Sequence, residues 1–125
     1  MSWKANILTI YPDMYPGPLS HSLIGKALDK KIWELNVYDL KEFGIGKHKK
    51  VDDKPFGGGP GMILRPDVLT AAIDQTLIKN HEGESLIYLS PKGQPITQKI
   101  VSSYSMLSGV SLICGHFEGI DQRLL

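Results

Sequence analysis

The sequence has a single cysteine and no long apolar run. Among 125 residues only Cys114 carries a thiol, which excludes an internal disulfide framework and suits a reducing cytoplasm. The first apolar stretch, "ANILTIY", is too short for a signal sequence or a membrane span. Fourteen basic and thirteen acidic residues nearly cancel to a net charge of +1, so overall charge gives no argument for nucleic-acid binding. We therefore expect a cytoplasmic protein without a membrane segment.

Residues that bind metals are also too sparse for a familiar site. The four histidines are scattered and Cys114 has no CxxC partner, so no tetrahedral ligand set has the required spacing. Cys114 follows an apolar run, and we expect a small buried residue there rather than a nucleophile. The sequence thus predicts no bound metal.

Short apolar runs alternate with segments that have helical periodicity along the whole chain. Such alternation predicts one α/β domain, a mostly parallel sheet with helices on both faces. A hydrophobic share of 42% is enough for a core. The predicted strands are 5–11, 33–38, 85–90 and 110–114, and the predicted helices are 18–31, 66–77 and 96–107.

Each predicted helix has an apolar stripe that we expect to be buried. Pro66 suits the first position of the second helix, and Gly109 is predicted to stop the third. The strand 85–90 is predicted to be buried. The expected stripes are Leu19, Leu23, Ile24, Ala27 and Leu28; then Val68, Leu69, Ala72, Ile73 and Leu77; then Ile96, Ile100, Tyr104 and Leu107.

The stretch "VDDKPFGGGPGM" at 51–62 belongs to a segment, 41–61, with no apolar period. We expect an irregular loop, because loops of about this length are usually functional or disordered. Its glycines match neither a P-loop nor a dinucleotide fingerprint. They permit close approach of backbone to a ligand, and a plain flexible loop is an equal alternative.

A basic cluster in the same segment has two interpretations. Clustered lysines are typical of a contact with a phosphate backbone, but the residues alone favour a solvated charged loop. The cluster comprises Lys47, His48, Lys49, Lys50 and Lys54.

The segment "CGHFEGID" follows the last predicted strand. Glu118 and Asp121 stand three residues apart and could share the face of a helix. A pair of carboxylates can act as a general base and its partner, and acidic residues at a helix start are also common in caps. Spacing alone favours the cap.

Three motifs in order, "VDDKPFGGGPGM", "IYLSPKGQ" and "CGHFEGIDQR", resemble the bacterial tRNA (guanine-N1)-methyltransferases of the knotted SPOUT class. The opening "ILTIYPDMY" fits as well, so the resemblance covers the whole chain. It implies methyl transfer from S-adenosylmethionine to N1 of guanosine-37, in a tRNA with guanosine 3′ of the anticodon. It also implies a homodimer with active sites between subunits.

The resemblance assigns roles to residues in all three motifs. Glu118 is implied as a contributor to catalysis. The implied cofactor contacts are Tyr88, Leu89, Ser90, Pro91, Gly115 and Gly119. The implied contacts to the tRNA are Asp52, Asp53, Gly57, Gly58, Gly59, Pro60 and Gly61.

Three residues depart from the usual pattern of that family. Phe56 and Phe117 stand where tyrosine is common, so each keeps ring area and lacks a hydroxyl. His116 replaces a common arginine or lysine. Histidine, with an ordinary pKa of about 6.5, makes the local charge dependent on pH.

Members of the family continue well past Leu125. The resemblance therefore implies that residues 1–125 are the N-terminal part of the methyltransferase domain, without the C-terminal tRNA-binding domain. The glycine-rich segment that closes the knot, and the usual general-base aspartate with its arginine partner, belong to the later part. We expect the 125-residue chain alone to be inactive with an incomplete knot. Two alternatives are a non-catalytic nucleic-acid or nucleotide-binding module and an isolated assembly unit.

Overall fold

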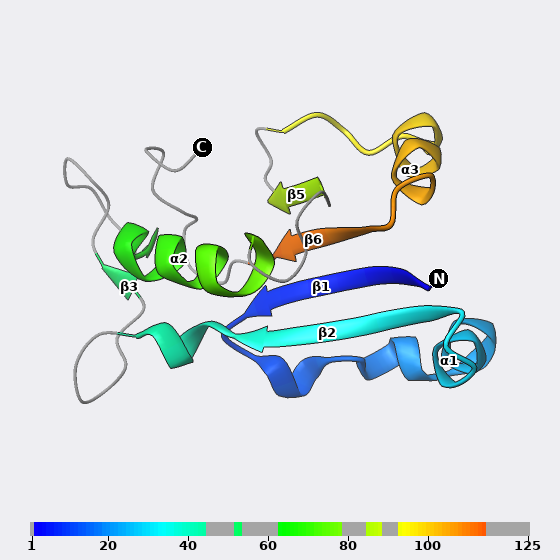
Figure 1. Cartoon of the computed structure of the whole chain (residues 1–125), viewed down its shortest axis with the longest axis horizontal. Helices are drawn as coiled ribbons and strands as arrows, with labels where there is room; N and C mark the ends of the chain where they lie inside the picture. Colours follow the sequence, from blue (N-terminus) through cyan, green and yellow to red (C-terminus); the bar gives the residue numbers. More distant parts are fainter. Residues whose placement is uncertain (1, 45–51, 54–62, 79–84, 89–92, 115–125) are drawn as a thin grey trace.

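The computed structural model describes residues 2–44, 52–53, 63–78, 85–88 and 93–114. Figure 1 shows strands that run side by side with helices around them. In chain order the elements are β1 (Trp3–Thr9), η1 (Pro12–Met14), η2 (Gly17–Ser20), α1 (Ser22–Asp29), β2 (Trp33–Asp39), η3 (Leu40–Phe43), β3 (Asp52–Asp53), β4 (Ile63–Leu64), α2 (Pro66–Ala72), η4 (Ile73–Ile78), β5 (Ser85–Tyr88), α3 (Gln98–Ser105) and β6 (Gly109–Ile113).

Four parallel strands form the main sheet in the order β2-β1-β6-β5. The first strand of the sequence is therefore central, and it pairs with one strand that follows closely and with another about 100 residues later. All four arrowheads in Figure 1 point to the same edge. The predicted mostly parallel α/β fold is confirmed.

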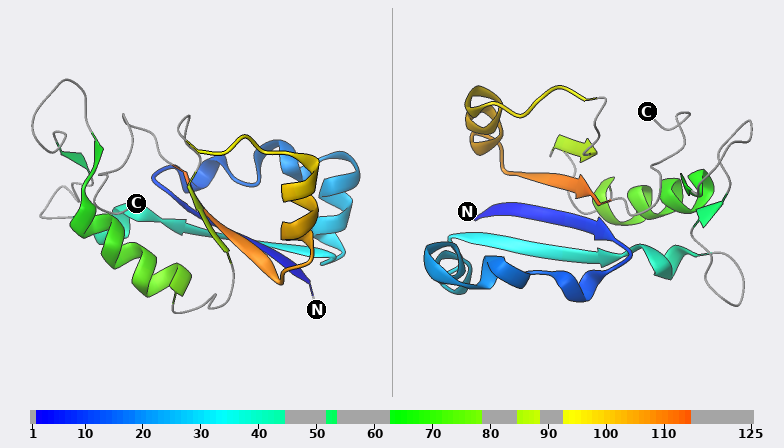
Figure 2. Two further views of the ribbon diagram at one scale, coloured as in Figure 1. Left: turned by 90° about the horizontal axis from the view of Figure 1, so that it is seen from above. Right: turned by 180° about the vertical axis from the view of Figure 1, so that it is seen from behind.

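Helices cover both faces of this sheet, as predicted. Leu8 of β1 lies level with Tyr38 of β2 and Ile113 of β6, and α2 with η4 packs on this face. On the other face, the Trp33 indole N–H donates to the carbonyl of Ile24 in α1 at 3.0 Å. The Trp3 indole likewise donates to the carbonyl of Tyr104 in α3 at 3.2 Å. Figure 2 shows α2 opposite α1 and α3.

The core lies under α2 at the carboxyl-terminal half of the strands. Leu69 and Ala72 are fully buried and Val68 nearly so, which confirms most of the stripe predicted for the second helix. Residues 73–78 continue it as a π-helical turn, with Thr76 Oγ1 donating to the Ala72 carbonyl. The buried cluster comprises Leu8, Ile10, Leu40, Val68, Leu69, Ala72, Leu77 and Ile113.

A polar ladder crosses the same face further toward the strand starts. Asn36 Nδ2 donates to Asn6 Oδ1 at 2.9 Å. Asn6 Nδ2 in turn donates to Ser111 Oγ and to the Val110 carbonyl, each at 3.3 Å. Asn6 has no exposed surface. Buried amides are costly without partners, so this ladder ties three strands to one register.

The first and third helices are more exposed than their patterns predict. Leu23 is 80% exposed on α1, and Ile96 before α3 is 67% exposed. The buried residue of α1 is instead Gly25, where a side chain would collide with the Ser20 backbone. The predicted burial of these two stripes is wrong in part, because both helices are short and touch the sheet over little of their length.

Two features near predicted boundaries also differ. Gly109 is the first residue of β6, not a helix stop, and a side chain there would collide with the Lys4 carbonyl on β1. Among the described strands β5 lies at the edge of the sheet, and Leu86 is 48% exposed, so the predicted burial of this strand is wrong. An edge strand has only one neighbour to cover it.

The predicted irregular loop contains two short regular elements. The Asp39 carboxylate accepts from the Lys41 N–H at 2.9 Å and thereby caps η3. Strand β3 pairs antiparallel with β4, aligning Asp52 with Leu64 and Asp53 with Ile63. The rest of the predicted loop, 45–51 and 54–61, lies outside the described residues.

Candidate functional site

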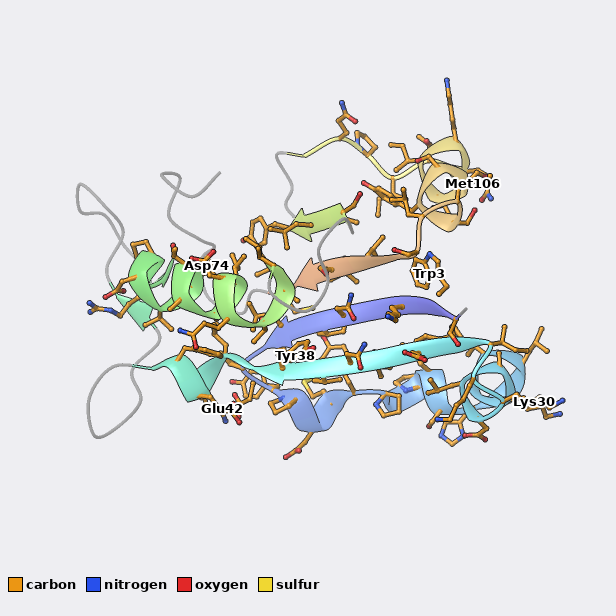
Figure 3. The ribbon with its side chains drawn as sticks, in the orientation of Figure 1. Trp3, Lys30, Tyr38, Glu42, Asp74 and Met106 are labelled. Carbon is orange, nitrogen blue, oxygen red and sulfur yellow. The ribbon has the colours of Figure 1, made fainter. Side chains whose placement is uncertain are left out.

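The carboxyl edge of the parallel sheet is where such folds bind ligands. Thr9, Asp39, Tyr88 and Ile113 end the four strands there. Figure 3 places Tyr38 and Glu42 near this edge, and Trp3 and Met106 at the opposite end of the sheet. The side chains at this edge define the candidate site.

Polar side chains at the ends of β1 and β2 form hydrogen bonds with the turns that follow these strands. Thr9 Oγ1 accepts from the Tyr11 N–H at 3.0 Å, and Asp39 caps the turn after β2. Both side chains therefore hold the backbone as it leaves the sheet. The half of the edge formed by β5 and β6 remains as the place for a ligand.

The end of β6 is held to β1 through its backbone. The Cys114 N–H donates to the Leu8 carbonyl on β1 at 2.9 Å. Hydrogen bonding with Cys114, with burial and the Cys114 charge as smaller causes, raises the pKa of Tyr15 from 10.0 to about 12. The Cys114 side chain is half-buried, so it is less enclosed than the sequence predicts.

The end of β5 borders a groove lined by described residues. Tyr88 aligns with Ile113 of β6 and packs on the core cluster. The groove has a volume of about 1130 Å³ and lies between the β5–β6 pair and α3. Residues on both sides of 89–92, Tyr88 before and 93–96 after, line it. The groove therefore adjoins the predicted cofactor loop at both of its ends.

The short hairpin β3–β4 leads directly into α2. Arg65 Nε and Nη2 donate to the two carboxylate oxygens of Asp67, each at 3.1 Å. The Asp67 carboxylate also accepts from the Val68 N–H at 3.0 Å. The Arg65 guanidinium lowers the pKa of Asp67 most, although Asp67 is largely exposed. Asp52 and Asp53 are thus attached to a helix that packs at the carboxyl half of the sheet.

Three of the predicted site residues are among those that the structure describes. Tyr88 ends β5, and Asp52 and Asp53 form β3. Tyr15 was not predicted as a site residue, because nothing in "YPDMYPG" indicates its contact with Cys114. Outside the described residues are Leu89, Ser90, Pro91, Gly57, Gly58, Gly59, Pro60, Gly61, Phe56, Gly115, His116, Phe117, Glu118, Gly119 and Asp121.

The described residues form neither a metal-binding cluster nor a membrane-spanning helix. No group of three or more histidine, cysteine or acidic side chains in this part of the chain could hold a metal ion. No helix there is long and apolar enough to cross a bilayer.

These features define a parallel α/β domain whose candidate site comprises two strand ends and a groove. The chain matches the family described as tRNA (Guanine-1)-methyltransferase TrmD over residues 3–125, and it belongs to that family. It is 53% identical over 125 residues to a tRNA (guanine-N(1)-)-methyltransferase of Ehrlichia canis, covering 100% of this chain and 53% of that protein. A protein of the same name from Ruegeria pomeroyi is 51% identical over 123 residues, covering 98% and 51%.

A solved structure supports the same relationship. The fold matches the crystal structure of tRNA (m1G37) methyltransferase from Aquifex aeolicus with a TM-score of 0.85 and 31% identity. The match covers 99% of this chain and 56% of that chain. The chain therefore spans about half the length of the relatives it matches.

Proposed function

We propose that the protein carrying this chain transfers a methyl group from S-adenosylmethionine to N1 of guanosine-37 in tRNA. The observation that carries this proposal is the family match over residues 3–125. The relatives and the Aquifex structure carry names that state this type of reaction. The proposal includes a cytoplasmic location, because tRNA is the substrate.

The proposed cofactor site lies where β5 and β6 end. Tyr88, Leu89, Ser90 and Pro91 would form one wall, and Gly115 with Gly119 the other. The fit is supported by the apolar groove beside Tyr88 and by the half-buried Tyr88 ring, which suit an adenosyl group. When bound, S-adenosylmethionine supplies a methyl group already activated by its sulfonium. No metal is needed for that activation.

Residues of the protein must then accept the proton that guanine N1 loses. Guanine N1 is protonated at neutral pH and loses its proton as the methyl group arrives, so a placed base contributes about 10²–10⁴ in rate. Glu118 is proposed to contribute, with the main base in the part of the family beyond residue 125. The 125-residue chain alone is therefore proposed to be inactive.

The tRNA is proposed to contact the segment that begins with β3. Asp52 and Asp53 would frame the target guanine, while Gly57, Gly58, Gly59, Pro60 and Gly61 let the RNA approach the backbone. The anchoring of β4 to α2 supports this placement, because it ties the segment to the carboxyl half of the sheet.

We further propose a homodimer, in which exposed apolar residues such as Leu23 are covered.

The test compares two lengths of protein. One is the 125-residue chain, and the other extends it through the second half of the family. Radiolabelled methyl transfer to a tRNA with guanosine 3′ of the anticodon is measured for both. We expect activity only in the long form, because pockets typically bury about 70–90% of a small ligand's surface and the short form lacks part of the wall.

Two outcomes would change the proposal. Equal turnover by the short chain would mean that Glu118 or another residue here is the base. A long form that binds tRNA but neither binds nor uses S-adenosylmethionine would favour a non-catalytic nucleic-acid module. Sedimentation at high concentration tests the dimer, and a clean monomer would contradict it.

A further inference from the structure

We propose that Asn6 is a positioning residue for the candidate site, because its amide sets the register in which β2, β1 and β6 lie side by side. Asn6 touches no ligand in this proposal. It acts through the level at which the strands end, and the place of Tyr88 at the carboxyl edge depends on that level. The part of the inference that concerns cofactor binding rests on the proposed function, whereas the part that concerns register does not.

The Asn6 side chain binds a neighbouring strand with each end of its amide. Its oxygen accepts from Asn36 Nδ2 on β2 at 2.9 Å, and its nitrogen donates to Ser111 Oγ on β6 at 3.3 Å. Asn6 aligns with both of these residues in the strand pairing, so the three side chains lie in one row across the sheet. Asn6 is 0% exposed and Ser111 is 2% exposed. A register without these bonds would leave a buried amide short of partners, which is costly.

The opposite face of the same strands does not select a register. Because side chains alternate between the faces of a sheet, a slip by two residues returns each one to its own face. On the ladder face such a slip of β6 along β1 would bring Asn6 level with Ile113 or Gly109 and remove its bond to Ser111. Single buried asparagines set register in the same way between coiled-coil helices. On the face away from α2 the slip would only exchange aliphatic neighbours, namely Ala5, Ile7, Val110 and Leu112.

Register decides where the described site residue Tyr88 lies. Parallel strands advance about 3.3 Å per residue, so a slip by two residues would move the end of β6 by about 7 Å relative to β1. Tyr88 is level with Ile113 of β6 and would move with it, away from the core cluster on which its ring packs. Site residues have to be held within about 0.5 Å of their productive geometry. The slipped form is therefore a form without a working site.

The first test measures register in the 125-residue chain and needs no cofactor. Through-space contacts between backbone protons of Ile7 and Leu112 report the native register, and contacts between Ile7 and Val110 report a slip. Asn6→Leu with Ser111→Ala removes the amide and its acceptor together. Both registers then bury similar aliphatic surface, so we expect the slipped form in about half of the molecules, against none detected in the unaltered chain. A single native register in this variant would overturn the proposal.

A matched pair of substitutions isolates the hydrogen bond from the shape of the side chain. Ser111→Thr and Ser111→Val add the same bulk, and only threonine keeps an oxygen that can accept from Asn6. We expect the native register alone in Ser111→Thr and a slipped fraction in Ser111→Val. Gly109 stays unchanged in every variant, because a side chain there would collide with the Lys4 carbonyl and restrain the same strand pair. Equal behaviour of the two variants would refute the role of the bond.

The second test measures affinity for S-adenosylmethionine in the protein extended through the family's second half. Affinity falls with the fraction of molecules able to bind, so Asn6→Leu with Ser111→Ala should bind about twofold more weakly. The control for lost stability is Ile7→Ala, which opens the buried opposite face and keeps the ladder. Its affinity should be unchanged where every variant is fully folded, and an equal loss there would refute positioning by Asn6. Absence of binding by the unaltered extended protein would instead refute the proposed function and leave the register result standing.

Discussion

Replacing Asn6 with alanine removes the centre of the polar ladder that joins β2, β1 and β6. Three hydrogen bonds are lost, each worth about 0.5–1.5 kcal/mol net. The Ser111 hydroxyl and the Val110 carbonyl stay in nearly buried residues without that partner, whereas the half-buried Asn36 amide can turn to water. We therefore expect a loss of about 2–4 kcal/mol in the free energy of unfolding.

Urea unfolding of the 125-residue chain measures this loss. With a slope of about 2 kcal/mol per molar, the middle of the range for a small domain, the midpoint should fall by roughly 1–2 M. Asn36→Ala is the comparison variant and should cost about 1–3 kcal/mol, because it removes one bond and leaves the fully buried Asn6 Oδ1 without this donor. A further variant, Asn6→Leu with Ser111→Ala, should recover part of the loss, since it removes both polar partners together. If Asn6→Ala lay within about 0.5 kcal/mol of the unaltered chain, the ladder would not be a stabilising element.

Two other perturbations have definite expected outcomes. Leu69→Ala, in the fully buried stripe of α2, should destabilise by about 2–5 kcal/mol, while Leu23→Ala on the exposed face of α1 should stay within about 0.5 kcal/mol; a large cost at Leu23 in the monomer would contradict its exposure. Asp67→Asn should lower stability slightly at neutral pH, because the Arg65 contact depresses the pKa of Asp67 in the folded state. That contribution is present above the ordinary pKa of 3.8 and is lost as pH falls through the lower pKa of the folded state. The difference in free energy of unfolding between the unaltered chain and Asp67→Asn should therefore be smaller at about pH 2 than at neutral pH. A difference that grew in acid would refute the assignment.

The sequence predicted the fold class because periodicity records which side of an element is buried. The α2 stripe was found correctly, since Val68, Leu69 and Ala72 all face the sheet. The α1 stripe was predicted wrongly at Leu23, because an apolar residue on a short helix does not by itself reveal whether the sheet reaches it. Periodicity also did not indicate that Gly109 belongs to β6, where close contact with the Lys4 backbone requires a glycine.

The candidate site was less predictable than the fold. Tyr88 could be placed from the strand pattern and the family motif. The contact between Tyr15 and Cys114 could not, because it joins two distant segments that meet only once β6 lies beside β1. Neither residue type indicates such a partner. Strand order could not be predicted either, because the alternation of strands and helices does not indicate which strands are neighbours.

The central position of β1 has a consequence for synthesis in the cell. β1 is the first strand of the sheet to be made, yet its neighbour β6 follows about 100 residues later. At about 5–20 residues per second, one edge of this apolar strand waits roughly 5–20 seconds for its partner. Unpaired strand edges of that kind promote aggregation. Chaperone capacity and translation rate should therefore affect the yield of folded protein in addition to the stability of the finished sheet.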